Sequence, residues 1–397
     1  MKVAICSVQE FNPMIGGIER VSVSLANELI SRGVEVIFIC CRKSPYGGEY
    51  HLPAHQYVLP DSTDYSEANV SKMAEIIREE HVDVILNQNA HSYLYNRQVF
   101  LVREKCSVPV VSVLHFDPLN RIKANQHLVD FQLHSIKNNI IGFFRQIAVS
   151  PLLTPLSMHS QRRLFRQIYD GSDATVLLSP QYFDSFKQVA GLTETTKLTS
   201  IYNMLSWPLD LSKTYEKDKL IIFVGRMNAQ KRPEQLLKAW KKIQHRLPDW
   251  RLVLVGDGDL LEQMKRFADS SMLERITFTG FQEPREYYRK GAIYVMCSSH
   301  EGWALTISEA MQHGCVPVVY NTFISLSDQI KNGESGLIVK PFDIKSLGES
   351  ILKLAKDEEL RNQMSRRAVL SRKEFTPEAV MPDWINLFEK VISASNK

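Results

Sequence analysis

A chain of 397 residues is long enough for roughly two or three domains, and its apolar content of 44% is ordinary for a globular protein. The formal charge of +4 is small for this length, which argues against a protein dedicated to binding nucleic acid. Six cysteines lie mostly in apolar runs, without CxxC spacing or neighbouring histidine pairs. We interpret them as reduced core residues and expect no metal site among them.

The amino-terminal residues MKVAICSVQE reach a polar residue too early for a secretory signal peptide. No apolar run is as long as a membrane-spanning helix needs to be. We therefore expect the protein in the cytosol, with contact to the inner face of the cell membrane as a further hypothesis that depends on local charge.

Apolar runs with strand character alternate with segments of helical period along almost the whole chain. This pattern is typical of parallel sheets covered by helices on both faces. The first series opens with a strand at 2–8, followed by a helix that ends at Gly33. The further strands predicted in this series are VEVIFIC, VDVILN, PVVSVLH and ATVLLS.

A second, more regular series opens at KLIIFVG, residues 219–225, and its further strands are RLVLVG, ITFTG, IYVMC, VPVVY and GLIVK. The segment NMLSWPLDLSKTYEKDK between the two series is polar, contains Pro208 and interrupts both periodicities. We therefore predict an α/β protein of two doubly wound parallel-sheet domains, 1–205 and 206–375. An amphipathic helical segment follows within 376–397.

The stretch 118–169 is too long for an ordinary connection and carries seven basic residues against a single acid, Asp130. The basic residues are Arg121, Lys123, Lys137, Arg145, Arg162, Arg163 and Arg166, and the aromatic ones are Phe131, Phe143, Phe144 and Phe165. Basic side chains interleaved with apolar ones suit an anionic membrane surface, where each cation contributes about 1 kcal/mol. A helical cap with a solvated basic face is the alternative.

Ligands of open α/β sheets bind beyond the carboxyl ends of the strands, so the turns at those ends are candidate sites. After the strand at 219–225, the turn GRMNAQKRPE places Arg226 and Lys231 just before a helix that begins near Pro233. Two cations beside a helix N-terminus make a site for a diphosphate. The alternative is that both are surface charges on a loop.

Two further turns are weaker candidates. The turn VGDGD offers Gly256 and Gly258, although a pair of glycines is weak evidence by itself. The turn TGFQEP puts Phe281 at a strand end, where its ring either meets a nucleobase or belongs to the core.

The turn HEGWALTISEAM carries two glutamates, Glu301 and Glu309, between two strand-like runs. Gly302 permits a sharp bend, and backbone NH groups near Ala304 and Leu305 would face an anion at the start of a short helix. A glutamate close to a phosphate is repelled, so we expect each carboxylate to accept hydrogen bonds from hydroxyl groups. A sugar on one side and a ribose on the other would satisfy that arrangement.

The first domain offers Gly16 and Gly17 at the start of its first helix, where backbone NH groups come close to a phosphate or a sugar. The GxGxxG dinucleotide fingerprint does not follow the first strand. His115 ends the strand PVVSVLH and is a candidate for the same site, although a lone histidine is usually structural.

Several of these segments together resemble the retaining glycosyltransferases of family 4, namely FVGRMNAQKRPEQLLKAW, LVLVGDG, ITFTGF and SSHEGWALTISEAMQHGCVPVV. The hallmark of that family is a glutamate, seven residues and a second glutamate. The segment GGIERVSVSLANELISRG fits as well, so the similarity covers nearly the whole chain.

The resemblance implies the GT-B architecture, in which two Rossmann-like domains face each other across a cleft and the last helix, here within 376–397, crosses back to the first domain. It implies that Arg226 and Lys231 hold the diphosphate of the donor and that Glu309 binds the ribose hydroxyls. The backbone near the phosphate is implied to be that of Gly302, Trp303, Ala304 and Leu305.

The transferred sugar is implied to lie against Glu301, with His115 and the Gly16–Gly17 loop approaching it from the first domain. Such enzymes are usually independent of metal, which suits a sequence with two cations at the site and no DxD motif at a strand end. No cofactor is expected. The implied mechanism is front-face displacement with retention, in which the leaving phosphate helps to deprotonate the acceptor and Glu301 acts electrostatically rather than as a nucleophile.

The sequence departs from the family in IYNML, which keeps Asn203 without its usual neighbours, and in the length of 118–169. Our main hypothesis is a hexosyltransferase that moves a sugar from a nucleotide diphosphate, a UDP-sugar, to a glycan or lipid-linked acceptor in surface polysaccharide or glycolipid synthesis. Two alternatives are a nucleotide-sugar epimerase on the same fold and a catalytically silent binding scaffold. Nucleic acid is not an expected partner.

Overall fold

The computed structural model describes residues 1–44, 50–119, 150–213 and 216–395. The chain forms two compact units, called unit 1 and unit 2 here. Unit 1 contains Met1–Leu119, Ser157–Ser206 and Phe375–Lys397, and unit 2 is built on Trp207–Glu374.

Unit 1 is built on a parallel sheet that has seven strands in the described residues, in the order β3-β2-β1-β4-β5-β6-β7. The strands are β1 (Lys2–Gln9), β2 (Glu35–Arg42), β3 (Gln56–Val58), β4 (Val84–Asn87), β5 (Val110–Leu114), β6 (Ala174–Leu177) and β7 (Leu198–Ser200). Strands β4, β5 and β6 are buried along their whole length. This explains why they read as continuous apolar runs and not as alternating ones.

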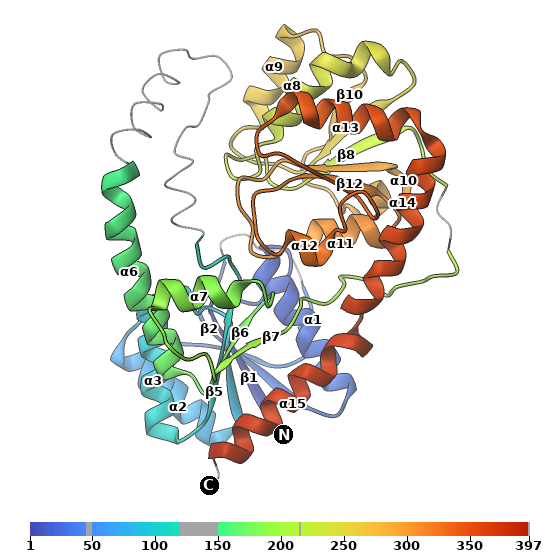
Figure 1. Ribbon diagram of the computed structural model, residues 1–397. Helices are drawn as coiled ribbons and strands as arrows, with labels where there is room; N and C mark the ends of the chain where they lie inside the picture. The colour runs from blue at the N-terminus through green and yellow to red at the C-terminus, as the bar shows by residue number, and fades with distance from the viewer. Residues whose placement is uncertain (45–49, 120–149, 214–215, 396–397) are drawn as a thin grey trace. The chain divides into compact units, whose positions relative to one another are not determined.

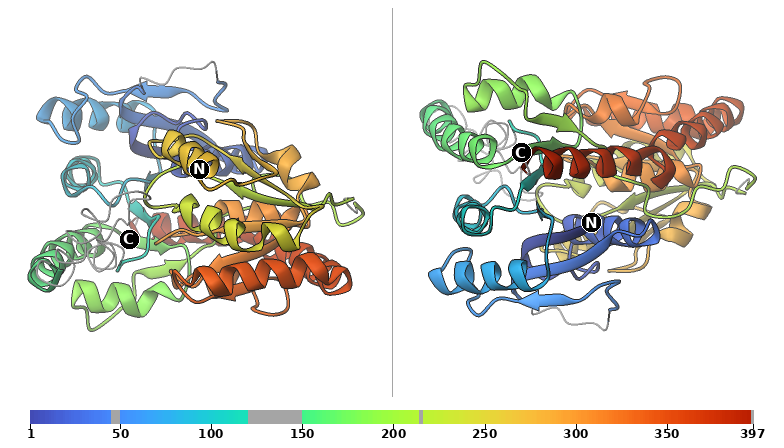
Figure 2. Two further views of the ribbon diagram at one scale, coloured as in Figure 1. Left: turned by 90° about the horizontal axis from the view of Figure 1, so that it is seen from above. Right: turned by 90° about the horizontal axis from the view of Figure 1, so that it is seen from below.

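Helices cover both faces of the unit 1 sheet (Figures 1 and 2). They are α1 (Gly17–Ser31), α2 (Glu67–Glu79), α3 (Tyr93–Cys106), α6 (Ser150–Gly171), α7 (Tyr182–Ala190) and α15 (Pro377–Ser395). Helices α2 and α3 share one apolar cluster with the sheet, and α15 packs against α1 and β4. The hydroxyls of Ser66 and Ser92 accept hydrogen bonds from NH groups of the first turns of α2 and α3, as N-cap residues do.

Unit 2 is built on a second parallel sheet, with six strands among the residues described, in the order β10-β9-β8-β11-β12-β13. The strands are β8 (Leu220–Val224), β9 (Arg251–Val255), β10 (Ile276–Phe278), β11 (Ile293–Met296), β12 (Val316–Tyr320) and β13 (Leu337–Val339).

Helices also cover both faces of the unit 2 sheet (Figure 1). They are α8 (Pro233–Ile243), α9 (Leu261–Ser270), α10 (Arg285–Lys290), α11 (Leu305–Gln312), α12 (Leu326–Gln329), α13 (Ile344–Lys356) and α14 (Glu358–Ser371), with short 3₁₀ turns at Gln244–Arg246 and Arg372–Phe375. Helices α8, α9 and α13 pack on one face around the buried Trp240. Helices α10, α11 and α12 pack on the other around Tyr294. Both doubly wound sheets predicted from the sequence are therefore present.

Every strand predicted from an apolar run is found, and two strands were not predicted. Strands β3 and β7 have three residues each and lie at the two edges of the unit 1 sheet. Because edge strands of this length are largely half-buried or exposed, they lack the apolar run that marks the inner strands. The six cysteines form no disulfide, and all except the half-buried Cys106 are buried, in line with their interpretation as core residues.

The basic stretch predicted at 118–169 is described only in part. Residues 120–149, with Arg121, Lys123, Lys137 and Arg145 and the aromatic Phe131, Phe143 and Phe144, lie outside the described residues. The remainder is the long helix α6. Among the described parts of the chain, we find no helix that combines the length and the apolar character needed to cross a membrane.

Candidate functional site

The candidate donor site lies at the carboxyl edge of the unit 2 sheet. Strand β8 has β9 on one side and β11 on the other, so the chain changes direction across the sheet between β8 and β11. Open α/β sheets bind ligands beyond the strands at such a switch point. The turn after β8 carries Arg226 and Lys231, and the turn after β11 carries Glu301, so the sheet brings these predicted residues together.

Hydrogen bonds fasten these two turns to each other. The Ser299 backbone NH donates to the Gln230 carbonyl at 2.8 Å. The Gln230 side-chain NH₂ donates to the His300 carbonyl at 3.1 Å. Because the contacts run in both directions, the residues that follow, Lys231 and Glu301, are held at a fixed spacing.

Lys231 and Glu301 form an ion pair in which Nζ lies 2.6 Å from Oε1. The two side chains are 15% and 10% exposed, so the pair is largely shielded from water. An ammonium has three donors and can therefore serve a carboxylate and a phosphate together. The repulsion expected between Glu301 and a phosphate is reduced by a cation that is already bonded to Glu301.

Arg226 is exposed at the same edge of the sheet. Within the described residues no carboxylate lies within ion-pair distance of its guanidinium. A guanidinium in this position is available for an anion such as a diphosphate. Arg226 and Lys231 therefore differ, since one is open to solvent and the other is paired.

The glycines of the neighbouring turns let backbones approach closely. A Cβ on Gly256 would lie 2.0 Å from the Gly225 carbonyl oxygen, and one on Gly258 would lie 2.5 Å from the Met227 carbonyl oxygen. Both glycines have positive φ, 139° and 155°. The pair noted in the sequence thus packs the turn after β9 against the turn after β8 and is structural.

Helix α11 begins at Leu305, four residues after Glu301. Its N-cap, Ala304, has no side chain that accepts from the first NH groups, which leaves this helix start suited to an anion. The Ser325 hydroxyl donates to the Gly302 carbonyl at 2.7 Å and so fastens the bend. Trp303 is only 6% exposed, so its indole is largely buried.

Glu309 lies in the second turn of α11 and is 1% exposed. The Tyr288 hydroxyl, from α10, donates to its Oε2 at 3.0 Å. The turn that precedes α10 carries Phe281, whose ring is 65% exposed. The exposed ring excludes the core alternative for Phe281 and leaves it open to a planar group.

The unit 1 sheet has its own switch point, between β1 and β4. The turn after β1 leads into α1, with Gly16 as its N-cap and Gly17 as its first residue. The Glu19 carboxylate lies so close to Gly16 that a Cβ there would be 2.6 Å from Oε2. An acid at this helix start disfavours a phosphate, so the loop suits a sugar better.

His115 follows β5 and meets a residue that the sequence did not single out. Its Nε2 lies 2.5 Å from Oε1 of Gln88, which follows β4. Burial, with a smaller contribution from His91, lowers the pKa of His115 to about 3. The imidazole is therefore neutral at physiological pH and acts as a hydrogen-bonding group, not as an acid.

A buried network of amides and hydroxyls fixes the strand end that carries Gln88. Asn87 Nδ2 donates to Asn96 Oδ1 at 2.9 Å and to Ser112 Oγ at 3.3 Å. Asn87 Oδ1 accepts from the Asn89 backbone NH at 3.0 Å. Gln88 is itself fully buried, and its Nε2 has no hydrogen-bond partner in the described part of the chain.

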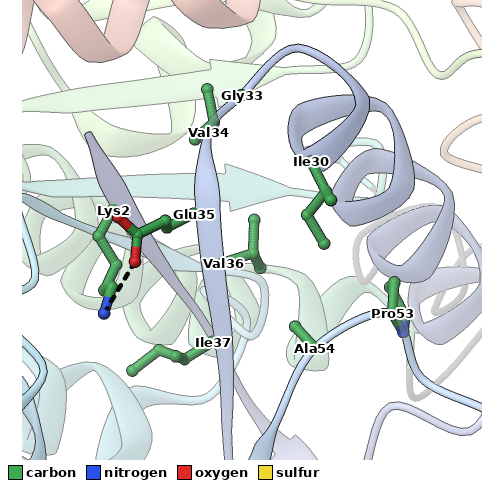
Figure 3. Close-up of a pocket in the computed structure, with 9 residues that line it drawn as sticks. All are labelled: Lys2, Ile30, Gly33, Val34, Glu35, Val36, Ile37, Pro53 and Ala54. Atoms are coloured by element: carbon green, nitrogen blue, oxygen red, sulfur yellow. Dashed lines mark ion pairs between the residues drawn. The ribbon is translucent and has the colours of Figure 1, made fainter.

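Two further features of the described residues concern metal ligands and a hollow. Among the described residues, no group of three or more His, Cys, Asp or Glu side chains is arranged to hold a metal. A hollow of about 370 Å³ lies beside the first residues of β1 and β2, and its wall includes the Lys2–Glu35 ion pair at 3.2 Å (Figure 3). It lies at the amino end of these strands and includes none of the predicted site residues.

Comparison with known families decides the identity of the fold. The family model described as Glycosyltransferase Family 4 matches residues 15–205, and the one described as Glycosyl transferases group 1 matches residues 211–370. The chain belongs to family 4 of the GT-B glycosyltransferases. The resemblance seen in the motifs is thereby confirmed.

Relatives in this glycosyltransferase family are distant. The chain is 23% identical to N-acetyl-alpha-D-glucosaminyl L-malate synthase of Bacillus anthracis, over 96% of this chain and 95% of that enzyme. It is 25% identical to poly(glycerol-phosphate) alpha-glucosyltransferase of Bacillus subtilis, over 58% of this chain but only 34% of the relative.

Solved GT-B structures superpose on the whole glycosyltransferase chain. Anabaena HepE, in complex with UDP, has a TM-score of 0.73 at 15% identity and covers 98% of this chain and 100% of its own. S. aureus TarM, in complex with fondaparinux, alpha-GlcNAc-glycerol and UDP, has a TM-score of 0.72 at 11% identity, with coverage of 98% and 99%. At these identities the likeness concerns the fold, which confirms the predicted GT-B class.

The sequence did not indicate three features of the two sheet edges. It did not identify Gln88 or Tyr288, and it did not predict that Lys231 and Glu301 would be paired. An amide after a strand and a tyrosine in a helix are too common to carry a signal. The ion pair joins residues 70 positions apart, a contact that no local pattern reveals.

Proposed function

We propose that the protein transfers a sugar, with retention of configuration, from a UDP-sugar to a hydroxyl group of a glycan or lipid-linked acceptor. The observation that carries this proposal is the set of groups at the switch point of unit 2. An exposed Arg226, the Lys231–Glu301 pair and the uncapped start of α11 lie at one edge of the sheet. Cations and helix NH groups recognise a diphosphate, and carboxylates recognise hydroxyls.

In this proposal Arg226, Lys231 and the backbone of Gly302 to Leu305 hold the diphosphate. Glu301 accepts hydrogen bonds from the transferred sugar, and Glu309 accepts them from the ribose. The base lies against Phe281. These side chains supply two positive charges to the leaving group, so the reaction is proposed to need no metal.

His115 and the Gly16–Gly17 loop are proposed to contact the sugar from unit 1. The neutral imidazole and the buried amide of Gln88 are hydrogen-bonding groups without charge, which suits hydroxyls. In the transfer itself, the acceptor oxygen forms a bond to C1 of the sugar and the bond from C1 to the diphosphate oxygen breaks. The leaving diphosphate takes the bonding electron pair and accepts the proton of the acceptor hydroxyl.

Names of relatives support the donor and acceptor classes. HepE and TarM were both solved with UDP. A Campylobacter jejuni relative, 24% identical over 47% of this chain, is named as an alpha-1,4-N-acetyl-D-galactosaminyltransferase acting on an undecaprenol-linked glycan. These names, with the B. subtilis enzyme, favour an acceptor in surface polysaccharide or glycolipid synthesis.

A donor screen tests the proposal. The protein is incubated with UDP-, GDP- and ADP-sugars, and release of the nucleoside diphosphate is measured with and without candidate acceptors. Hydrolysis or transfer from a UDP-sugar is expected, and proton NMR of the first product formed should show the anomeric configuration of the donor. A changed sugar with no released UDP would indicate an epimerase, and binding of UDP without any turnover would indicate a scaffold.

We also propose that α6 contributes to contact with an anionic membrane surface. Arg162, Arg163 and Arg166 are exposed on this helix. Arg166 is the least suitable to mutate because its guanidinium donates to the carbonyls of Ala190 and Gly191, at 3.0 and 2.7 Å, at the end of α7. Arg163 stacks on Tyr93, with Cζ 4.8 Å from the ring centre, and keeps its charge exposed.

Flotation with vesicles of phosphatidylglycerol and phosphatidylcholine tests this contact. The double variant Arg162→Gln/Arg163→Gln should float less than the wild type, by roughly 1 kcal/mol of partition free energy per charge at low salt. The matched control is Lys242→Gln, an exposed cation on α8. Equal flotation of all three proteins would remove α6 from the proposal.

A further inference from the structure

We infer that Tyr288 is a positioning residue that orients the Glu309 carboxylate for the two ribose hydroxyls of the donor, and that it thereby makes the site selective for ribonucleotides over 2′-deoxyribonucleotides. This inference rests on the proposed function, because it concerns the ligand assigned to Glu309. The hydroxyl of Tyr288 donates to Oε2 of Glu309, so its part is to orient Glu309 and not to touch the donor.

The contact between Tyr288 and Glu309 is made inside the apolar cluster on one face of the unit 2 sheet. The hydroxyl of Tyr288 lies 3.0 Å from Oε2, and the two residues are 0% and 1% exposed. A hydrogen bond to an ionised group is stronger than a neutral one, and little water is present to compete for it. A carboxylate has two oxygens and about four acceptor positions, of which Tyr288 occupies one on Oε2.

Tyr288 is itself held from two sides. Its ring stacks on His313 with ring centres 6.1 Å apart and an angle of 18° between the planes. His313 Nδ1 lies 2.9 Å from the Glu309 carbonyl, one turn earlier in α11. Trp207 packs edge-on against both rings. The tyrosine is therefore tied to the same helix that carries the carboxylate it orients.

Lys217 fastens the backbone of this arrangement. Its Nζ donates to the Tyr288 carbonyl at 2.9 Å and to the His313 carbonyl at 2.5 Å. These carbonyls belong to the last turn of α10 and to the residue that follows α11. An ammonium at a helix C-terminus satisfies carbonyls that have no partner within the helix. Tyr288 and Glu309 thus approach each other from two helices whose ends share one cation.

Fixed orientation matters because a glutamate side chain has three torsions, and the bond from Tyr288 to Oε2 favours one setting of the carboxylate. A site built to bond a hydroxyl group rejects the analogue that lacks it, since the buried polar group is then left without a partner. A carboxylate that can turn away loses this penalty. The selectivity for the 2′-hydroxyl therefore depends on the hydrogen bond from Tyr288.

The test compares UDP with 2′-deoxy-UDP by isothermal titration calorimetry on four proteins: wild type, Tyr288→Phe, Glu309→Gln and Tyr294→Phe. The last is the matched control, because Tyr294 is equally buried and its hydroxyl donates to Thr306 Oγ1 at 2.7 Å, not to Glu309. We expect the wild type and Tyr294→Phe to prefer UDP at least tenfold, and Tyr288→Phe and Glu309→Gln to lose most of that preference. The preference is a ratio measured on one protein, so partial unfolding of a variant does not alter it.

The outcomes separate the inference from the proposed function. If the wild type binds neither nucleotide, the proposed function fails and the inference fails with it. A wild type that binds both equally removes the ribose from Glu309 and overturns the inference. If the wild type discriminates and Tyr288→Phe discriminates equally well, the donor site stands and the inference alone is wrong.

Discussion

The carboxyl edges of the two sheets share one topology and differ in chemistry. In each sheet the first strand lies between its successor and a later strand, which creates a switch point. At the edge of unit 2 the described side chains are charged, with Arg226 exposed and Lys231 bonded to Glu301. At the edge of unit 1 His115 is neutral and contacts the amide of Gln88, and the charged group beside Gly16 is an acid, Glu19.

The proposed function assigns a different ligand to each edge because of this difference. A diphosphate requires positive charge and helix NH groups. A sugar hydroxyl is bound well by neutral donors and acceptors, and a charged group without a partner there would carry a desolvation penalty. The topology determines where the sites lie, and the side chains on the turns determine which ligand each can hold.

The largest effect is expected from removing the charged side chains at the edge of the unit 2 sheet. Lys231→Met should lower kcat/KM for the donor by roughly 100- to 1000-fold, because it removes a cation from the leaving group and leaves Glu301 without its partner. Glu301→Gln should lower it by a comparable factor, and the double variant should be little worse than either single one because the residues act as a unit. Steady-state kinetics with the donor found in the screen measures this.

The control for the charged edge is Lys242→Met, which removes an exposed cation from the other end of α8 and should leave kcat/KM within about twofold. If the fold-loss of kcat/KM in the double variant equals the product of the two single fold-losses, Lys231 and Glu301 act independently and not as a pair.

A smaller effect, on stability, is expected from substituting one turn glycine of each unit, of which Gly256 in unit 2 has less space around it than Gly16 in unit 1. Gly256→Ala should lower the free energy of unfolding by roughly 2 to 3 kcal/mol, because the new Cβ would meet the Gly225 carbonyl at 2.0 Å and φ is positive. Gly16→Ala in unit 1 should lower it by less than about 1 kcal/mol, since φ is −165° and the nearest atom ends a flexible glutamate. Urea unfolding measures both, and equal losses would show that the turns of unit 2 are no tighter than those of unit 1.

The smallest effect concerns His115, at the edge of unit 1, and its response to pH. The pKa of His115 is lowered from 6.5 to about 3 in the folded protein, so the unfolded chain binds more protons between these values. Stability from this group is complete above pH 6.5 and is lost as the pH falls toward 3. Gln88→Glu should raise the pKa of His115, by placing a carboxylate beside Nε2, and should therefore reduce this acid loss.

Urea unfolding at pH 7 and at pH 5 compares the wild type with Gln88→Glu, and NMR of the imidazole resonances follows His115 directly. His115→Gln identifies its signals and removes its share of the acid loss. Titration of His115 near pH 6.5 in the wild type would show that burial does not keep its imidazole neutral in the folded protein.

The sequence was sufficient to predict the sheets because their inner strands are buried on both faces and appear as apolar runs. Since parallel strands end at one edge, the turns with Arg226, Lys231 and Glu301 could be assigned to one site without coordinates. The short edge strands β3 and β7 were not predictable because three half-exposed residues carry no distinct pattern. A strand can therefore be predicted from sequence when it is long and buried enough to form an apolar run, and not otherwise.

Interactions between distant residues could not be predicted. The bond from Tyr288 to Glu309 depends on how α10 and α11 pack, and the contact of Gln88 with His115 depends on the register of β4 and β5. Both partners in each case are common residue types. The sequence shows which groups are present at a strand end but not which group orients which.

Helix α15 has a consequence for the order in which the protein is made. It completes unit 1 with five buried side chains, Val380, Met381, Trp384, Phe388 and Val391, yet the ribosome reaches it only after all of Trp207–Glu374. During translation, unit 2 can therefore fold before α15 has been made and has packed against α1 and β4 of unit 1. Premature termination just after Glu374 would leave the first-made sheet without that cover and exposed to chaperones and proteases, while the later-made unit could still fold.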